Sequence, residues 1–402
     1  MTSPVPQNQT RQSNNNEEAE KVPLNQAGID EKENQIVIND FREYIETLKT
    51  KGYQCRSDVN QPSISTKPHW LDESLFRHAK SVYERHFMGM NFAHLSGLLL
   101  LVRVDSIYKT LAQTGKSDSV AKLFERYYHT VMHVKGWYEG DIFEENSEAQ
   151  RSLMIVRGMH NRVSRELNTK VSINQTDLNN SQNDIDSSST INSNSNDSSV
   201  AHRTGRKTEF HISEYDIMIT QFAFVGFVVT NAKSIGLIDD FSQQDLESLL
   251  HFWRVIGFYL GASDQFNLCS YKLDQIRHLC EAITEVEYRR SIAKNPINSP
   301  PGIMSINIVR SVKFIPMLTI YGMMKYLYEL LGIDTSEFDD KGTRYSRLSY
   351  TLITLVMSNL LQYRPLRSFN NGLTRLSLYA VGKVESWFER RLQSKYGTEL
   401  NL

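Results

Sequence analysis

Two histidine-bearing helices carry the residues of this sequence that are best suited to chemistry. His160 fills a slot in an apolar stripe made by Leu153, Val156, Val163 and Leu167 at helical spacing. An imidazole in such a stripe is typical either of a core histidine satisfied by a backbone carbonyl or of an axial ligand to haem iron. The spacing alone leaves both interpretations open.

The preceding helix presents polar side chains of the kind that a haem site needs on the side opposite its axial ligand. Arg126, His129 or Thr130, and His133 lie three or four residues apart, which puts a cation, an imidazole and a hydroxyl along one side. If this side faces His160, the two helices offer an axial nitrogen, a polar opposite face and apolar walls. The alternatives are a surface histidine pair or half of a non-haem metal site, for which the pattern supplies no matching carboxylates.

Two further apolar segments contribute one candidate residue each. Thr220 is an interior polar residue of the helix expected over 213–230, where it either bonds the carbonyl one turn back or lines a buried pocket. Arg254 lies in an aromatic-rich helix and needs a partner there, for which a haem propionate or a buried carboxylate would serve. The pattern itself does not choose between these alternatives.

The composition restricts the class of protein that presents these residues. The chain has 402 residues, a formal net charge of −1 and three cysteines without paired or zinc-type spacing. Nucleic-acid binding depends on clustered Lys and Arg and is not expected, and neither a disulfide framework nor a zinc site is predicted. No stretch reaches the roughly 18 uninterrupted apolar residues of a membrane span. Membrane association is therefore not indicated, and we expect a cytoplasmic location, with peripheral attachment to the ER membrane as the alternative.

Helical periodicity through most of the chain predicts an all-α fold, a single large helical bundle. Residues 1–35 and the Asn/Ser-rich insertion 168–207 are too polar to offset ordering entropy and are expected to be disordered. Residues 296–402 are expected to complete or cover the bundle. The expected helices span 70–87, 92–114, 117–137, 146–167, 213–230, 242–261, 270–292, 304–332, 343–362 and 370–395.

Four segments, taken in order, resemble the rubber oxygenase catalytic domain, the family of latex clearing proteins and ER-bound mpaB-type oxygenases. They are RxxHT at 126–130, RGMHNRV at 157–163, ISEYDIMITQFAFVGFVV at 212–229 and LHFWRVIGFYLGASDQFNLC at 250–269. The similarity covers residues 65–295. It implies a globin-like helical core that holds haem b and uses dioxygen to cleave a carbon–carbon double bond in an apolar, isoprenoid substrate.

The resemblance also implies roles for individual residues. His160 matches the proximal ligand of the haem iron, Arg126 and Thr130 belong to the distal side, and Thr220 matches a distal threonine. The chain departs from the family at His129, because latex clearing proteins have a lysine there that can occupy the sixth iron position. Imidazole is a stronger iron ligand than an amine that must first lose a proton. A non-catalytic haem sensor or carrier with bis-histidine iron is therefore the alternative to an oxygenase.

Overall fold

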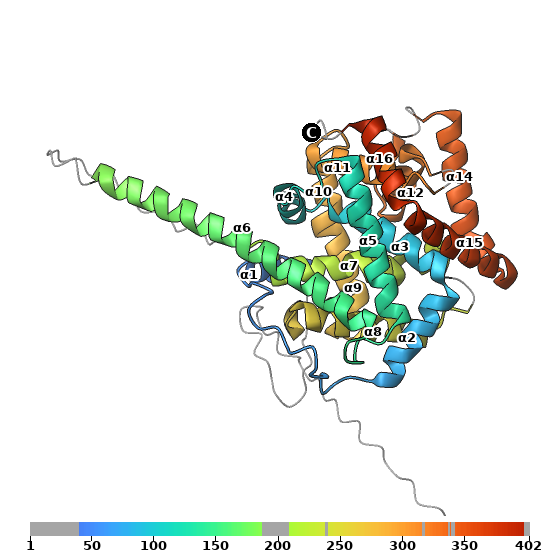
Figure 1. Cartoon of the computed structure of the whole chain (residues 1–402), viewed down its shortest axis with the longest axis horizontal. Coiled ribbons are helices and arrows are strands. Elements are labelled where there is room, and N and C mark those ends of the chain that lie inside the picture. Colours follow the sequence, from blue (N-terminus) through green and yellow to red (C-terminus); the bar gives the residue numbers. More distant parts are fainter. Residues whose placement is uncertain are drawn as a thin grey trace, which may run out of the picture. The chain divides into compact units, whose positions relative to one another are not determined.

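The computed structural model shows an α-helical chain (Figure 1). It describes residues 40–186, 209–237, 240–315, 318–336, 338 and 342–397, and of residues 171–186 the backbone alone. Contacts group Phe41–Leu402 into one compact unit. The only β feature of its described residues is an isolated bridge between Arg56 and Ser213. The expected all-α fold is confirmed, and the tail expected over 1–35 lies outside the described residues.

The described residues form α-helices joined by turns, 3₁₀ segments and, between Gly52 and Glu73, a longer irregular segment. The helix α9 continues through a π-helical segment, Thr284–Arg289, into α10. In chain order the α-helices are α1 (Phe41–Gly52), α2 (Glu73–Arg85), α3 (Phe87–Leu101), α4 (Asp105–Gln113), α5 (Val120–Glu139), α6 (Glu148–Asp186), α7 (Glu214–Asn231), α8 (Gln243–Leu260), α9 (Leu273–Ile283), α10 (Arg290–Lys294), α11 (Pro300–Ser311), α12 (Ile320–Leu330), α14 (Arg344–Ser358), α15 (Arg364–Lys383) and α16 (Glu385–Tyr396).

The helix α7 lies at the centre of the unit and packs against α3, α8 and α9. It begins at a capping box, in which Ser213 and Asp216 satisfy each other's backbone N–H groups. Its approach to α3 is close, because a Cβ atom added at Gly97 would lie 1.7 Å from the carbonyl oxygen of Ala223. The segment Glu214–Ile235 is long and apolar enough to cross a membrane, and 61% of its apolar 18-residue window is buried inside the protein. That burial is what a core helix requires.

Three expected helices are wrong in extent, because turns divide them. Residues 92–114 form parts of α3 and α4, whose axes differ in direction by 87°. Residues 304–332 are divided between α11 and α12, and residues 370–395 between α15 and α16. The helix α1 was not expected. Because apolar residues continue on both sides of each turn, the apolar pattern does not locate the turn.

The beginning of the expected insertion is helical rather than irregular. The helix α6 continues to Asp186, well past residue 168. Asn168 is buried. Its side chain donates to the carbonyl oxygen of His211 at 3.1 Å and accepts from the backbone N–H of His211 at 2.8 Å. These two bonds hold α6 beside the segment that leads into α7, and extending a helix beyond such a point costs little. Residues 187–208 lie outside the described residues.

Candidate functional site

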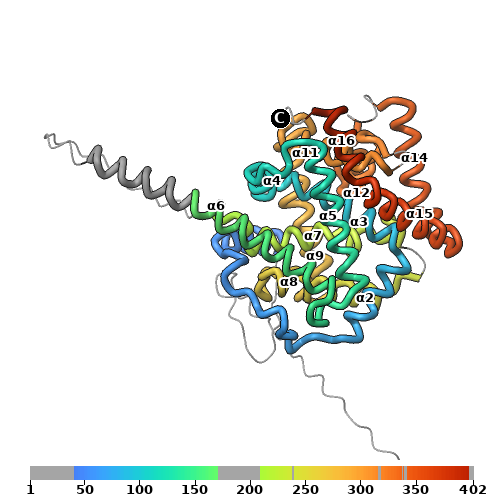
Figure 2. Tube along the Cα trace, in the orientation of Figure 1, coloured from blue at the N-terminus to red at the C-terminus, as the bar shows by residue number. Residues whose placement is uncertain are grey.

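The helices α5 and α6 pack against each other (Figure 2). Ser152 of α6 connects them, since its hydroxyl lies 2.7 Å from Nδ1 of His133 and accepts from Nε1 of Trp137 at 3.0 Å. The positive charge of Arg126 helps to lower the pKa of the His160 imidazole. The predicted cation and imidazole on neighbouring helices therefore interact electrostatically.

His160 is a neutral imidazole with an unused nitrogen. Burial, and then the positive charge of Arg126, lower its pKa to about 4. Its Nδ1 atom is buried and has no hydrogen-bond partner among the described residues. No hydrogen bond of the described residues therefore occupies this nitrogen. A neutral imidazole with a free nitrogen is the form that binds a metal ion.

The apolar stripe around His160 is buried at both ends and partly exposed in the middle. Leu153 and Leu167 are buried, with exposed fractions of 0% and 5%. Val156, His160 and Val163, which lie between them, each keep part of their surface accessible. The middle of the stripe is therefore accessible, whereas its two ends are buried.

Arg126 is a largely enclosed cation whose partner is a hydroxyl. Its Nη2 donates to Oγ1 of Thr114 at 3.0 Å, and burial lowers its pKa. Among the described residues no carboxylate forms an ion pair with it. Thr130, one turn on, donates its hydroxyl to the carbonyl of Arg126 at 2.9 Å, so this donor is used within α5. The charge of Arg126 is therefore available to a group that binds beside His160.

Thr220 is an exception within α7. Every other position from Tyr215 to Val228 is buried, whereas Thr220 keeps accessible surface. Its hydroxyl donates to the carbonyl of Asp216 at 2.7 Å, one turn back, as the structural alternative predicted. No hydrogen bond within the described part of the chain joins it to the α5–α6 pair, so its membership of the site stays a prediction.

His129 and Arg254 have partners of their own. The Nε2 atom of His129 lies 2.8 Å from the carboxylate of Glu385 in α16, and the side chain of His129 is 49% exposed. The guanidinium of Arg254 lies 3.9 Å from the ring centre of Trp70, and its Nη2 is 3.8 Å from Asp264. Asp264 is 75% exposed, and the buried Nε of Arg254 has no hydrogen-bond partner among the described residues, so the role of Arg254 stays a prediction. His129 must leave Glu385 before it can bind iron.

The sequence analysis missed the loop that holds α6 on both sides of His160. Gln61 and Asn161 exchange hydrogen bonds of 2.9 and 2.7 Å, and Oε1 of Gln61 also accepts from Nε of Arg157 at 2.7 Å. Arg157 precedes His160 by three residues and Asn161 follows it directly. No local signal marks Gln61, because it lies in an irregular segment 96 residues before Arg157.

The described residues contain no group of three or more His, Cys, Asp or Glu side chains that could hold a metal ion. Glu385 lies beside His129, but His129, His133 and Glu385 do not form such a group in this part of the chain. A haem iron takes its other ligands from a macrocycle, so one neutral histidine with a free nitrogen is compatible with it. The buried, unpartnered Nδ1 of His160 meets that requirement.

The fold is similar to that of a solved structure, latex clearing protein LCP in the closed state. The TM-score is 0.51 at 15% sequence identity, and the match covers 89% of this chain and 92% of that chain. This coverage is larger than residues 65–295 could supply, so the shared fold includes C-terminal helices. No protein-family model and no curated protein sequence matches the chain. The likeness confirms, at the level of the fold, the resemblance that the four segments indicated.

Proposed function

We propose that the chain is a haem b-dependent oxygenase that cleaves or oxidises a carbon–carbon double bond of an apolar, isoprenoid substrate with dioxygen. The observation that carries the proposal is the pair formed by His160 and Arg126, a neutral imidazole with a free nitrogen beside an unneutralised guanidinium. The fold shared with latex clearing protein supports it. The proposal names the substrate by class, since one fold can serve many substrates.

In this proposal each side chain has a role that follows from its surroundings. His160 would hold the iron through its free imidazole, and bound haem would supply the chemistry of dioxygen. Arg126 would stabilise negative charge that develops on the reacting oxygen, because a preorganised cation acts strongly where water is excluded. The hydroxyls of Thr130 and Thr220 already donate to backbone carbonyls. They can therefore accept a hydrogen bond from a bound group but not donate one.

The absorption spectrum tests the cofactor. We expect the purified apoprotein to take up one haem per chain on titration, with a Soret band that His160→Ala abolishes. His278→Ala is the matched control, because His278 is a 59% exposed histidine on α9. Circular dichroism of both variants monitors folding. Full haem content in folded His160→Ala would show that the ligand assignment is wrong.

Oxygen consumption tests the reaction. With squalene as the probe, we expect dioxygen uptake coupled to carbonyl products. Arg126→Met should keep the haem and lower kcat by about 10²-fold or more, the usual effect of removing one charge-stabilising group. Haem binding without uptake on squalene or a shorter prenyl chain would contradict the oxygenase and leave the sensor or carrier.

The alternative function is a non-catalytic haem sensor or carrier with bis-histidine iron. His129 favours it, since its ion pair with Glu385 is half exposed and such pairs contribute little stability, so exchange to iron would cost little. Sharp low-spin bands in the reduced haem protein that disappear in His129→Ala would support this alternative. A high-spin reduced spectrum together with product formation would support the oxygenase.

A further inference from the structure

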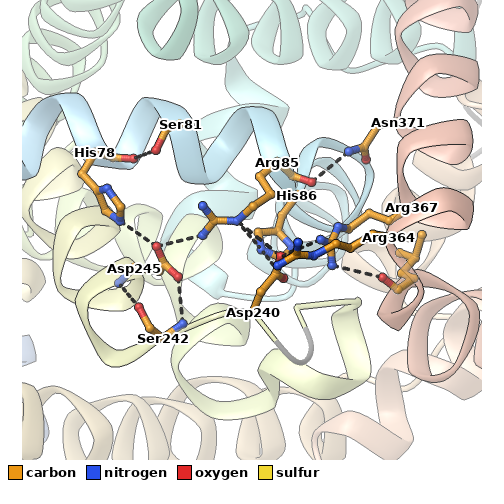
Figure 3. A network of polar contacts seen from close by, with 11 residues as sticks. His78, Ser81, Arg85, His86, Asp240, Ser242, Asp245, Arg364, Arg367 and Asn371 are labelled. Carbon is orange, nitrogen blue, oxygen red and sulfur yellow. Dashed lines mark hydrogen bonds and ion pairs between the residues drawn. The ribbon is translucent and has the colours of Figure 1, made fainter.

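The helix α15 turns its polar face toward the protein (Figure 3). Arg367 donates to the carboxylate of Asp240 at 2.7 Å. The side chain of Asn371 donates to the carbonyl of Arg85 at 2.9 Å and accepts from the backbone N–H of Met88 at 2.9 Å. Arg367 and Asn371 are only 5% and 9% exposed. A helix on a protein surface normally buries its apolar face, and the first half of α15 does the reverse. Further along the helix the buried residues are Leu378 and Val381.

The outer face of α15 is a continuous apolar stripe. Leu366, Phe369, Leu373 and Leu376 follow one another at intervals of three or four residues, so they line one side of the helix. Their exposed fractions run from 39% for Leu366 to 68% for Phe369, and Tyr379 near the end of the helix is 65% exposed. Nothing in the described part of the chain covers this stripe.

The neighbouring helices repeat the arrangement. In α14, Ser346 and Ser349 are buried while Tyr345, Leu348 and Leu355 are exposed. Trp387 of α16 is 51% exposed. Of the seventeen large apolar side chains exposed among the described residues, eleven lie in 345–387, so the exposure belongs to one region rather than to the whole surface. Figure 1 shows these helices at the orange-to-red C-terminal end of the chain.

The charge of this region favours an anionic partner. Residues 342–384 contain six Arg and Lys and no Asp or Glu, in a chain whose net charge is −1, and the first turn of α16 adds Glu385. Three of the six cations pair with carboxylates, Arg364 and Arg367 with Asp240 and Arg375 with Glu139. Arg344, Arg347, Arg364 and Lys383 are exposed. Exposed Leu, Phe, Tyr and Trp side chains among cations are what a bilayer with anionic headgroups binds. A second copy of the same face would oppose like charges, which disfavours self-association.

We propose that α14, α15 and the first turn of α16 form a docking face for an anionic lipid bilayer. In this arrangement α15 lies in the plane of the interface, with Phe369 and Leu373 at the boundary between headgroups and acyl chains. The exposed cations contact the headgroups, and the buried Arg367 and Asn371 hold the helix to the protein. The contact is peripheral and does not rest on the proposed oxygenase function.

Flotation of the full-length protein with vesicles tests the face, with phosphatidylcholine alone compared with its mixture with phosphatidylserine. We expect binding to the anionic vesicles that weakens at high salt. The double substitution Phe369→Ser and Leu373→Ser should reduce the partition coefficient about tenfold or more. The matched control is Met154→Ser with Ile155→Ser, since these side chains are 50% and 55% exposed on α6. All four positions are exposed, so folding should persist, and the thermal midpoint checks this.

Trp387 offers a second readout. Its emission should shift to the blue on addition of anionic vesicles, and Trp387→Phe should remove that shift. Failure to bind either vesicle would overturn the proposal, and equal, salt-independent binding to both would overturn its anionic component. If the protein binds no vesicles but forms a dimer that the double substitution dissociates, the face would instead bind a second copy of the chain. Because no haem and no substrate are present, none of these outcomes depends on the proposed reaction.

Discussion

The aromatic core around His94 and the interface of α5 with α6 each enclose a neutral imidazole. His94 of α3 is 2% exposed, and burial lowers its pKa to about 3. Within the described part of the chain its Nε2 has no hydrogen-bond partner, just as Nδ1 of His160 has none. A low pKa and an unpaired nitrogen are therefore shared by both regions. Neither property alone distinguishes a ligand of a metal from a residue of the core.

The surroundings of the two rings differ. His94 is enclosed by aromatic rings, with the centroids of Phe224, Trp253 and Tyr138 at 5.2, 5.9 and 6.3 Å. His160 instead lies between partly accessible valines and beside the charge of Arg126. Perturbed pKa values mark functional sites only in combination with access and a charged neighbour. Access is thus the property that separates the two histidines.

The largest expected effect is on stability. His94→Ala leaves a cavity among packed rings and should lower the free energy of unfolding by about 3 kcal/mol, as large-to-small core substitutions do. It should leave haem stoichiometry unchanged. His160 keeps accessible surface, so His160→Ala leaves a smaller cavity and should lower the free energy of unfolding by less than about 1 kcal/mol. Urea unfolding of the two variant apoproteins measures both changes in the free energy of unfolding. Equal decreases would show that the two regions are alike.

Acid should act on the core through His94. Its pKa is about 3 in the folded protein against an ordinary value of 6.5, so the unfolded chain binds the proton first. The stability that its neutral form contributes is present above about pH 6.5 and is lost as the pH falls toward 3. His94→Phe should therefore flatten the decline of unfolding free energy with acidity. Parallel profiles for the two apoproteins would contradict the placement of His94.

The hydrogen bonds between Gln61 and α6 should affect only the region around His160. Gln61→Ala removes the hydrogen bonds that hold Arg157 and Asn161 on either side of His160. Residues that orient a metal ligand typically account for a 10- to 100-fold change in affinity, and we expect about tenfold weaker haem binding. The Soret band should remain dependent on His160. Gln243→Ala, on an exposed face of α8, is the control, and an equal effect of both would contradict this role of Gln61.

The smallest expected effect concerns His129. Glu385→Gln removes a half-exposed ion pair and should change the free energy of unfolding by less than about 1 kcal/mol. If His129 can bind iron, the same substitution should increase the low-spin fraction of the reduced haem protein. His129→Ala should cancel that increase. An unchanged spectrum would place His129 outside the haem site and leave His160 as the one histidine ligand.

The sequence by itself determined the features that depend on neighbours along the chain. The period of the α6 stripe predicted both the helix and the inward position of His160. The starts of α7 and α8 follow from Ser213 with Asp216 and from Ser242 with Asp245, and both capping boxes are present. Caps and periodicity act within one or two helical turns, so local residues suffice to specify them.

Only the tertiary structure decided which partners distant residues take. It gave Glu385 to His129 and Asp264 to Arg254, and it placed Gln61 against α6. It also decided that α15 buries Arg367 and exposes Phe369. An amphipathic pattern shows that a helix has two faces, but the face that is buried depends on what packs against it. For α15 the carboxylate of Asp240 and the backbone of α2 and α3 select the polar face.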